Sequence, residues 1–89
     1  MNELESISSF KVFPNPNQGR FSILIEGSSA SEIEISIINI LGEDIIQRNI
    51  HLESGAYRSD FELPDIKSGM YMLRLSSSTS SLHRKFIVE

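Results

Sequence analysis

The sequence predicts an all-β fold in one domain. Thirteen of its 89 residues are Ile, which favours strands, whereas Ala, the strongest helix former, occurs only twice. Apolar and polar residues alternate with a period of two along most of the chain. Gly, Pro and Ser interrupt this alternation at intervals of roughly 8–12 residues, which is the spacing of short antiparallel strands. A chain of this length allows one domain and no more.

The first strand is placed by what surrounds it. Residues 1–9 are polar and acidic, so we predict a linker or flexible N-terminus there. Residues 10–13 are predicted as a short strand that ends at the Pro-Asn-Pro turn of residues 14–16. A proline holds the preceding residue in extended backbone and cannot donate to a sheet ladder. Gly19 then gives the backbone the freedom to reverse direction.

Two longer strands follow, over residues 20–26 and 32–40, with a Gly- and Ser-rich loop between them. The residues expected to point inward from them are Phe21, Ile23, Ile25, Ile33, Ile35 and Ile37. Ile38 and Ile40 lie on the opposite face of the second strand. Because they are also apolar, we expect the far end of this strand to be covered on both sides.

The second half of the chain contains four more predicted strands. They are expected over residues 44–52, 57–63, 70–75 and 82–88. The separators are a tight hairpin turn at Gly42, a break at Gly55, a corner that begins at Pro64 and a serine-rich loop over residues 76–81. Seven strands at this spacing predict an antiparallel, immunoglobulin-like β-sandwich with Greek-key connections.

Tyr71 stands two residues after Gly69, at the start of the sixth predicted strand. This position is similar to the tyrosine corner of Greek-key sandwiches. In such a corner, the hydroxyl of the tyrosine bonds to a backbone group a few residues upstream. We therefore expect Tyr71 to have mainly a structural role.

Composition excludes several classes of function. The formal net charge is −4 and the basic residues are scattered, so nucleic acid is not an expected partner. No apolar run approaches the ~20 residues that span a bilayer, so no direct membrane span is predicted. The sequence contains no Cys, which excludes disulfides and thiolate metal sites.

No catalytic, metal or cofactor site is predicted. His51 and His83 are expected to face solvent from mid-strand positions, and the chain has no G-x-S-x-G elbow to pair with them. The acidic pairs Glu32/Glu34 and Asp60/Glu62 lie on outward faces, where charges serve solubility and protect strand edges. The chain is therefore not expected to be an enzyme.

Four motifs follow one another in a set order. They are a Pro-Asn-Pro turn with its glycine, a hairpin glycine, a Gly-x-Tyr pair and a basic residue in the last strand. The residues are Pro14, Asn15, Pro16, Gly19, Gly42, Gly69, Tyr71 and Lys85. In this order and spacing they resemble the C-terminal sorting domain, type A, of the type IX (Por) secretion system, over about residues 10–89.

Two positions depart from the family pattern. Asn39 stands where the family often has Asp, three residues before the hairpin glycine. Glu43 stands directly after that glycine, where a basic residue is more usual. Neither departure alters the predicted fold, so the resemblance implies that their effect is on recognition.

The resemblance implies a non-catalytic secretion signal that targets a fused cargo protein to the type IX translocon. The cargo would be exported across the outer membrane and attached to the cell surface, so the implied location is secreted or cell-surface, by way of the periplasm. The implied partners are the outer-membrane translocon, a sortase-like cysteine protease of the same system and the fused N-terminal cargo domain. The cut site would lie in the linker ahead of Phe10.

Two further points stay open at this stage. Docking of a partner is expected to use strand addition at an exposed edge of the first or last strand. The alternative function is a carbohydrate- or protein-binding, fibronectin-like β-sandwich module of a secreted hydrolase. The chain has no Trp, and Tyr57 and Tyr71 are both predicted to point inward, which disfavours a platform for stacking sugars.

Overall fold

The computed structural model describes residues 7–27, 31–53, 55–78 and 80–89. The regular structure within these ranges is all β, as the sequence predicts. The strands are β1 (Ile7–Phe13), β2 (Arg20–Gly27), β3 (Ser31–Asn39), β4 (Asp44–Leu52), β5 (Gly55–Glu62), β6 (Gly69–Ser76) and β7 (Ser81–Val88). No helix in the described part of the chain is long and apolar enough to cross a membrane.

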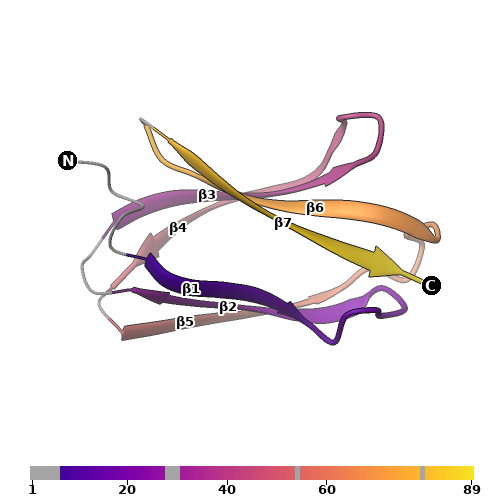
Figure 1. The fold of residues 1–89 in the computed structure, drawn as a ribbon, viewed down its shortest axis with the longest axis horizontal. Coiled ribbons are helices and arrows are strands. Elements are labelled where there is room, and N and C mark those ends of the chain that lie inside the picture. Colours follow the sequence, from indigo (N-terminus) through magenta and orange to yellow (C-terminus); the bar gives the residue numbers. More distant parts are fainter. Residues whose placement is uncertain (1–6, 28–30, 54, 79) are drawn as a thin grey trace.

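The seven strands form two stacked antiparallel sheets (Figure 1). One sheet has the order β1-β2-β5 and the other has the order β4-β3-β6-β7. The chain crosses between the sheets after β2, β4 and β5, so β2 pairs with β5 and β3 pairs with β6. This confirms the predicted Greek-key sandwich. In the constant-type immunoglobulin fold the fourth strand joins the first sheet, whereas β4 here joins the second.

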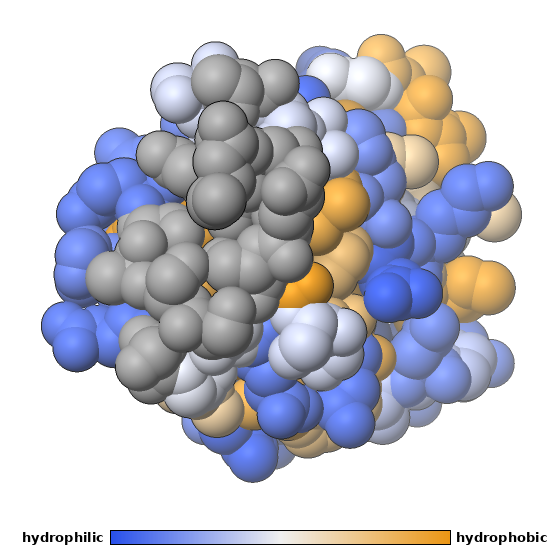
Figure 2. All heavy atoms as spheres, turned by 60° about the vertical axis from the view of Figure 1, so that its left-hand side comes forward, coloured by the Kyte–Doolittle hydropathy of each residue, from blue (hydrophilic) through white to orange (hydrophobic). Residues whose placement is uncertain are grey.

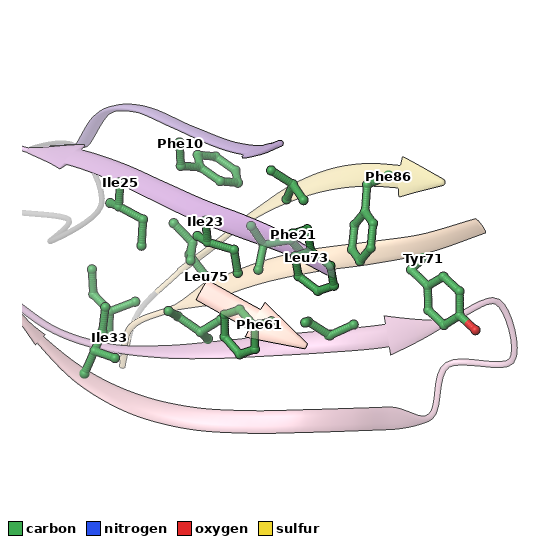
Figure 3. Packing of buried hydrophobic residues seen from close by; sticks show 14 of the residues in the cluster. Phe10, Phe21, Ile23, Ile25, Ile33, Phe61, Tyr71, Leu73, Leu75 and Phe86 are labelled. Atoms are coloured by element: carbon green, nitrogen blue, oxygen red, sulfur yellow. The ribbon is translucent and has the colours of Figure 1, made fainter. Parts of the chain in front are cut away.

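The core lies between the two sheets and follows the predicted alternation. Figure 3 shows side chains from both sheets pointing into this space. All six residues predicted to point inward from β2 and β3 are buried. The whole cluster consists of Phe10, Val12, Phe21, Ile23, Ile25, Ile33, Ile35, Ile37, Ile50, Leu52, Phe61, Tyr71, Leu73, Leu75, Phe86 and Val88.

Four aromatic rings fill one end of this core. Tyr71 stacks on Phe86 with ring centroids 5.8 Å apart, and Phe86 lies 5.0 Å from Phe21. Phe21 in turn stacks on Phe61 at 5.5 Å. The row therefore runs from β6 through β7 and β2 to β5, and it ties both sheets together. Each such pair adds about 0.5–1.5 kcal/mol beyond the burial of its area.

The first strand begins earlier than the sequence indicates. β1 starts at Ile7, three residues before the predicted start at Phe10, because β2 extends to Gly27 and pairs with Ile7. A register shift between Ile7 and Ser9 accommodates the polar residues at this edge. The boundary of the predicted linker after residue 9 remains a prediction, and residues 1–6 lie outside the described ranges.

The expectation that Ile38 and Ile40 are both covered is wrong for Ile40. β3 ends at Asn39, so Ile40 belongs to the turn and not to the sheet face. Its side chain is 77% exposed, whereas Ile38 is half-buried. Alternation in the sequence shows which face a residue belongs to, but it does not show whether anything lies over that face.

Candidate functional site

The eight candidate signal residues lie at one end of the sandwich, which we call the signature end. Four segments meet there: the β1–β2 loop, the β3–β4 turn, the β5–β6 corner and the last residues of β7 (Figure 1). The last residues of β2, β4 and β6 and the first residues of β3, β5 and β7 lie at the other end, which we call the opposite end. Residues far apart in the sequence are thus brought to a common region.

The Pro-Asn-Pro loop is hydrogen-bonded to the last strand. The backbone N–H of Ile87 donates to Asn15 Oδ1 at 3.0 Å, and the N–H of Asn17 donates to the carbonyl of Ile87 at 3.0 Å. The N–H of Glu89 donates to the carbonyl of Asn17 at 2.7 Å. The edge of β7 is therefore already occupied at Ile87 and Glu89, and the strand addition expected from the sequence stays a prediction for the other parts of the edges.

Asn17 organises the loop from within, and sequence reasoning missed it. Its side chain is buried, with Nδ2 donating to the carbonyl of Pro14 at 3.1 Å. Its Oδ1 accepts from the N–H of Gly19 at 2.9 Å. Asn commonly bonds its own backbone two residues on, which is the signal that could have identified this position. A buried side chain with hydrogen bonds at both its amide nitrogen and its amide oxygen stabilises a single loop conformation.

Gly19 packs against the β5–β6 corner and leaves no room for a side chain. Its φ is +96°, in the left-handed region that favours glycine. A Cβ at this position would lie 2.6 Å from the carbonyl oxygen of Leu63 and 2.9 Å from Cγ2 of Ile66. The N–H of Leu63 donates to the carbonyl of Gly19 at 2.7 Å. The β1–β2 loop is therefore fixed to the corner as well as to β7.

Tyr71 forms the predicted tyrosine corner. Its hydroxyl donates to the backbone carbonyl of Lys67, four residues upstream, at 2.6 Å. Its ring is buried against Phe86, which it also faces across the β6–β7 ladder. Gly69 pairs with Val88 in the same ladder. The Gly-x-Tyr pair thus joins the corner to the last strand.

The side chain of Asn39 holds the β3–β4 turn. Its Oδ1 accepts from the N–H of Leu41 at 2.9 Å and from the N–H of Glu43 at 3.0 Å. Its Nδ2 donates to Oε1 of Glu43 at 3.0 Å. Asn39 and Glu43, the two residues that depart from the family pattern, are therefore hydrogen-bonded to each other. Gly42 occupies the tip with φ of +86°, and its N–H donates to the carbonyl of Asn39 at 3.0 Å.

Lys85 faces outward from β7 and lines a groove of about 400 Å³ on the outer face of the four-stranded sheet. Gly42 and Tyr71 also line this groove, so it collects three of the eight candidate residues. Its remaining lining includes Ile38, Met70 and Met72, which makes it mainly apolar.

The outer face of the three-stranded sheet is charged by contrast. Asp60 accepts from the hydroxyl of Ser22 at 2.5 Å and from Nε of Arg58 at 3.1 Å. The hydrogen bond from Ser22, followed by that from Arg58, lowers the pKa of the Asp60 carboxyl below its usual value. All of these side chains are near solvent, and a surface network of this kind contributes little to stability.

The two histidines lie away from the signature residues and face solvent, as predicted. Nδ1 of His51 lies 2.6 Å from Oε1 of Glu32 at the opposite end. Within residues 7–27, 31–53, 55–78 and 80–89, no three His, Asp or Glu side chains are placed to hold a metal ion. The signature end therefore combines hydrogen-bonded loops with an apolar groove. Such an arrangement suits the binding of a partner.

Comparison with known protein families adds one finding. The family model described as "Secretion system C-terminal sorting domain" matches residues 11–89 of the chain. The match includes all eight candidate residues and every strand from β2 onward. No curated protein matches the chain.

Proposed function

The chain belongs to the family of secretion system C-terminal sorting domains, and on this premise we propose that it directs a fused cargo protein through the type IX translocon. In this proposal the cargo crosses the outer membrane and becomes attached to the cell surface. The domain itself is not an enzyme in this role. It acts by presenting a folded surface that the export machinery binds.

The observation that carries the proposal is the family match over residues 11–89. The arrangement of the candidate residues supports it. Asn15 and Asn17 hold the β1–β2 loop on β7, and Gly19 holds the same loop on the β5–β6 corner. A surface fixed in this way loses little conformational entropy when a partner binds, which favours recognition.

Separation of the cargo from this domain would involve a second partner. We propose that a sortase-like cysteine protease of the type IX system separates the cargo from this domain. A protease needs an extended backbone that is not paired in a sheet. Because Ile7–Phe13 is already paired with β2, the proposed cut lies before Ile7.

The direct test is a gain of export. A reporter with an N-terminal signal peptide is expressed in a type IX secreting bacterium, with and without this chain fused to its C-terminus. We expect the reporter alone to remain in the periplasm and the fusion to reach the cell surface or the medium. A fusion that stays in the periplasm would refute the proposal.

A truncation tests the same proposal by loss. Removal of residues 84–89 takes away Phe86 and Val88, which are buried in the core, so the truncated domain is expected to lose both its fold and export. Normal surface delivery of the truncated fusion would contradict the sorting role. The gain-of-export test remains the decisive one, because the truncation changes fold and surface together.

A further inference from the structure

An apolar surface is left open at the signature end. Among the described residues, Ile40 is 77% exposed, Leu41 is 78% exposed, and Met70 and Ile87 are each almost half exposed. Figure 2, in which the opposite end comes forward, shows apolar side chains at its upper right, at the height where Figure 1 places the β3–β4 turn. We call the groove lined by Ile38, Ile40, Met70, Met72 and Lys85 the apolar groove.

The turn beside the groove does not need its apolar residues for folding. Its conformation is set by Asn39 and Gly42 through the hydrogen bonds described above. Ile40 and Leu41 contribute only their backbone to that arrangement, yet both carry large apolar side chains into solvent. Contiguous exposed apolar surface of this kind marks an interaction site.

Lys85 gives the groove a positive charge that has no ion-pair partner among the residues that the structure describes. It is the one charged residue that lines the groove, and none of the ion pairs among the described residues involves it. The two acids next to the β3–β4 turn are engaged elsewhere, because Glu43 bonds to Asn39 and Asp44 pairs with Arg74. An ammonium group beside apolar surface favours a carboxylate on whatever docks there.

The size of the surface argues against a second copy as the occupant. Ile40, Leu41, Met70 and Ile87 together expose on the order of a few hundred Å² of apolar surface, about the largest patch of a typical monomer. A standard protein interface buries about 800 Å² on each partner. The groove therefore fits a single segment of a partner better than it fits the face of a stable dimer.

We infer that the apolar groove and the Ile40–Leu41 turn receive a protein segment of the export machinery that carries apolar side chains and a carboxylate placed to pair with Lys85. This inference rests on the proposed sorting function and assigns the surface that performs it. The methionines suit such a role, because their flexible thioether side chains adapt to the shape of an apolar partner.

The test uses the reporter fused to the full chain, with paired substitutions. Met70→Glu and Lys85→Glu place a carboxylate in the groove, whereas Met70→Leu and Lys85→Arg keep its chemistry. Ile45→Glu and Lys11→Glu are the matched controls, since both positions are exposed and neither lines the groove. Thermal unfolding of each purified domain shows that it is folded, as expected for outward-facing positions.

We expect Met70→Glu and Lys85→Glu to lower the exported reporter by roughly tenfold, as for substitutions at the centre of an interface. The two conservative variants and the two controls should export like the parent. Export at the parental level by folded Met70→Glu and Lys85→Glu would overturn the inference and leave the sorting function standing. Failure of the unsubstituted fusion would remove the sorting function, and the inference with it.

Two further results would also overturn the inference. Sedimentation that shows a dimer of the parent domain, dissociated by Met70→Glu, would make a second copy the occupant. Parental export by Lys85→Gln would show that no carboxylate pairs with Lys85. A loss of export by Lys85→Gln that is smaller than the loss by Lys85→Glu supports the pairing.

Discussion

Two connections of the sandwich, the β1–β2 loop at the signature end and the β6–β7 turn at the opposite end of a molecule 37 Å long, are held in different ways. At the signature end, hydrogen bonds join segments far apart in the sequence, as between Asn15 and Ile87 or between Gly19 and Leu63. At the opposite end, the β6–β7 turn is closed by neighbours, with the N–H of Ser77 donating to the carbonyl of Ser80 at 2.9 Å.

The two kinds of hydrogen bonding have different structural consequences. A locally closed turn fixes how two adjacent strands are joined, and no other part of the chain has to be in place for it to form. Bonds between distant segments fix the relative positions of a loop, a corner and a strand end. The signature end is therefore a composite surface that exists only when the whole domain is folded.

The largest effect is expected from Gly19→Ala. The new Cβ would lie 2.6 Å from the carbonyl oxygen of Leu63, on backbone with positive φ. Steric crowding and backbone strain together should lower the free energy of unfolding by about 3 kcal/mol, measured by chemical denaturation.

Gly42→Ala is the control for Gly19→Ala, since Gly42 also has positive φ but no atom of the described residues lies within 4 Å of the new Cβ. We expect Gly42→Ala to lower the free energy of unfolding by about 1 kcal/mol, from backbone strain alone. Equal losses at the two glycines would mean that the contact between the β1–β2 loop and the corner is unimportant.

Asn17→Ala should have the next largest effect. It leaves the N–H of the buried Gly19 without its partner and removes the part-buried bond to the carbonyl of Pro14. The expected loss of unfolding free energy is about 2 kcal/mol. Asn49→Ala, at an exposed position of β4, should change it by less than about 0.5 kcal/mol. A loss at Asn17 no greater than that at Asn49 would contradict the role of Asn17 in the loop.

Tyr71→Phe isolates the hydrogen bond of the corner, because the ring and its contact with Phe86 remain. Loss of the bond to Lys67 should cost about 1 kcal/mol in unfolding free energy. Tyr57→Phe, on the half-buried Tyr57 of β5, provides the comparison. Identical unfolding midpoints for Tyr71→Phe and the parent would show that the corner does not stabilise the fold.

The smallest effect on the free energy of unfolding is expected from lowering the pH. The β1–β2 loop is held on β7 and on the β5–β6 corner by amide and carbonyl groups, which have no acid titration. Asp60 does titrate, and its pKa is lowered in the folded state by the bonds from Ser22 and Arg58. Its contribution is therefore present above the usual pKa of an aspartate and is lost as the pH falls through the lowered value.

Asp60→Asn should accordingly be less stable than the parent at neutral pH, by a small amount, and the two unfolding curves should converge in strong acid. Thermal unfolding across an acid titration measures this difference. A gap that persists or widens in acid would mean that the carboxylate of Asp60 is not the stabilising group.

The sequence predicted the strands and the core because both depend on local patterns. Alternation identified the inward residues, and Pro64 and Gly69 marked the corner. The position of Tyr71 predicted a bond from its hydroxyl to a backbone group a few residues upstream, which the structure shows to be the carbonyl of Lys67. The hydrogen bonds that join Asn15 and Asn17 to β7 could not be predicted in this way. It joins residues 72 positions apart, and such a contact depends on how the finished sheets are stacked.

The apolar groove was missed for a related reason. The sequence places Ile38, Met70 and Met72 on outward faces. The pattern of apolar residues is the same whether such a face is covered by other parts of the protein or exposed to solvent. Only the fold shows that β3 ends before Ile40 and that the face beside it is uncovered.

The most direct measurement of the central claim is the exported fraction of a reporter fused to two folded variants, one altered at each end. Lys85→Glu and Ser78→Glu each place a carboxylate at an exposed position, the first at the signature end and the second in the β6–β7 turn. We expect Ser78→Glu to export like the parent and Lys85→Glu to remain largely in the periplasm. Equal export of the two variants would contradict the assignment of the signature end as the surface that the secretion machinery reads.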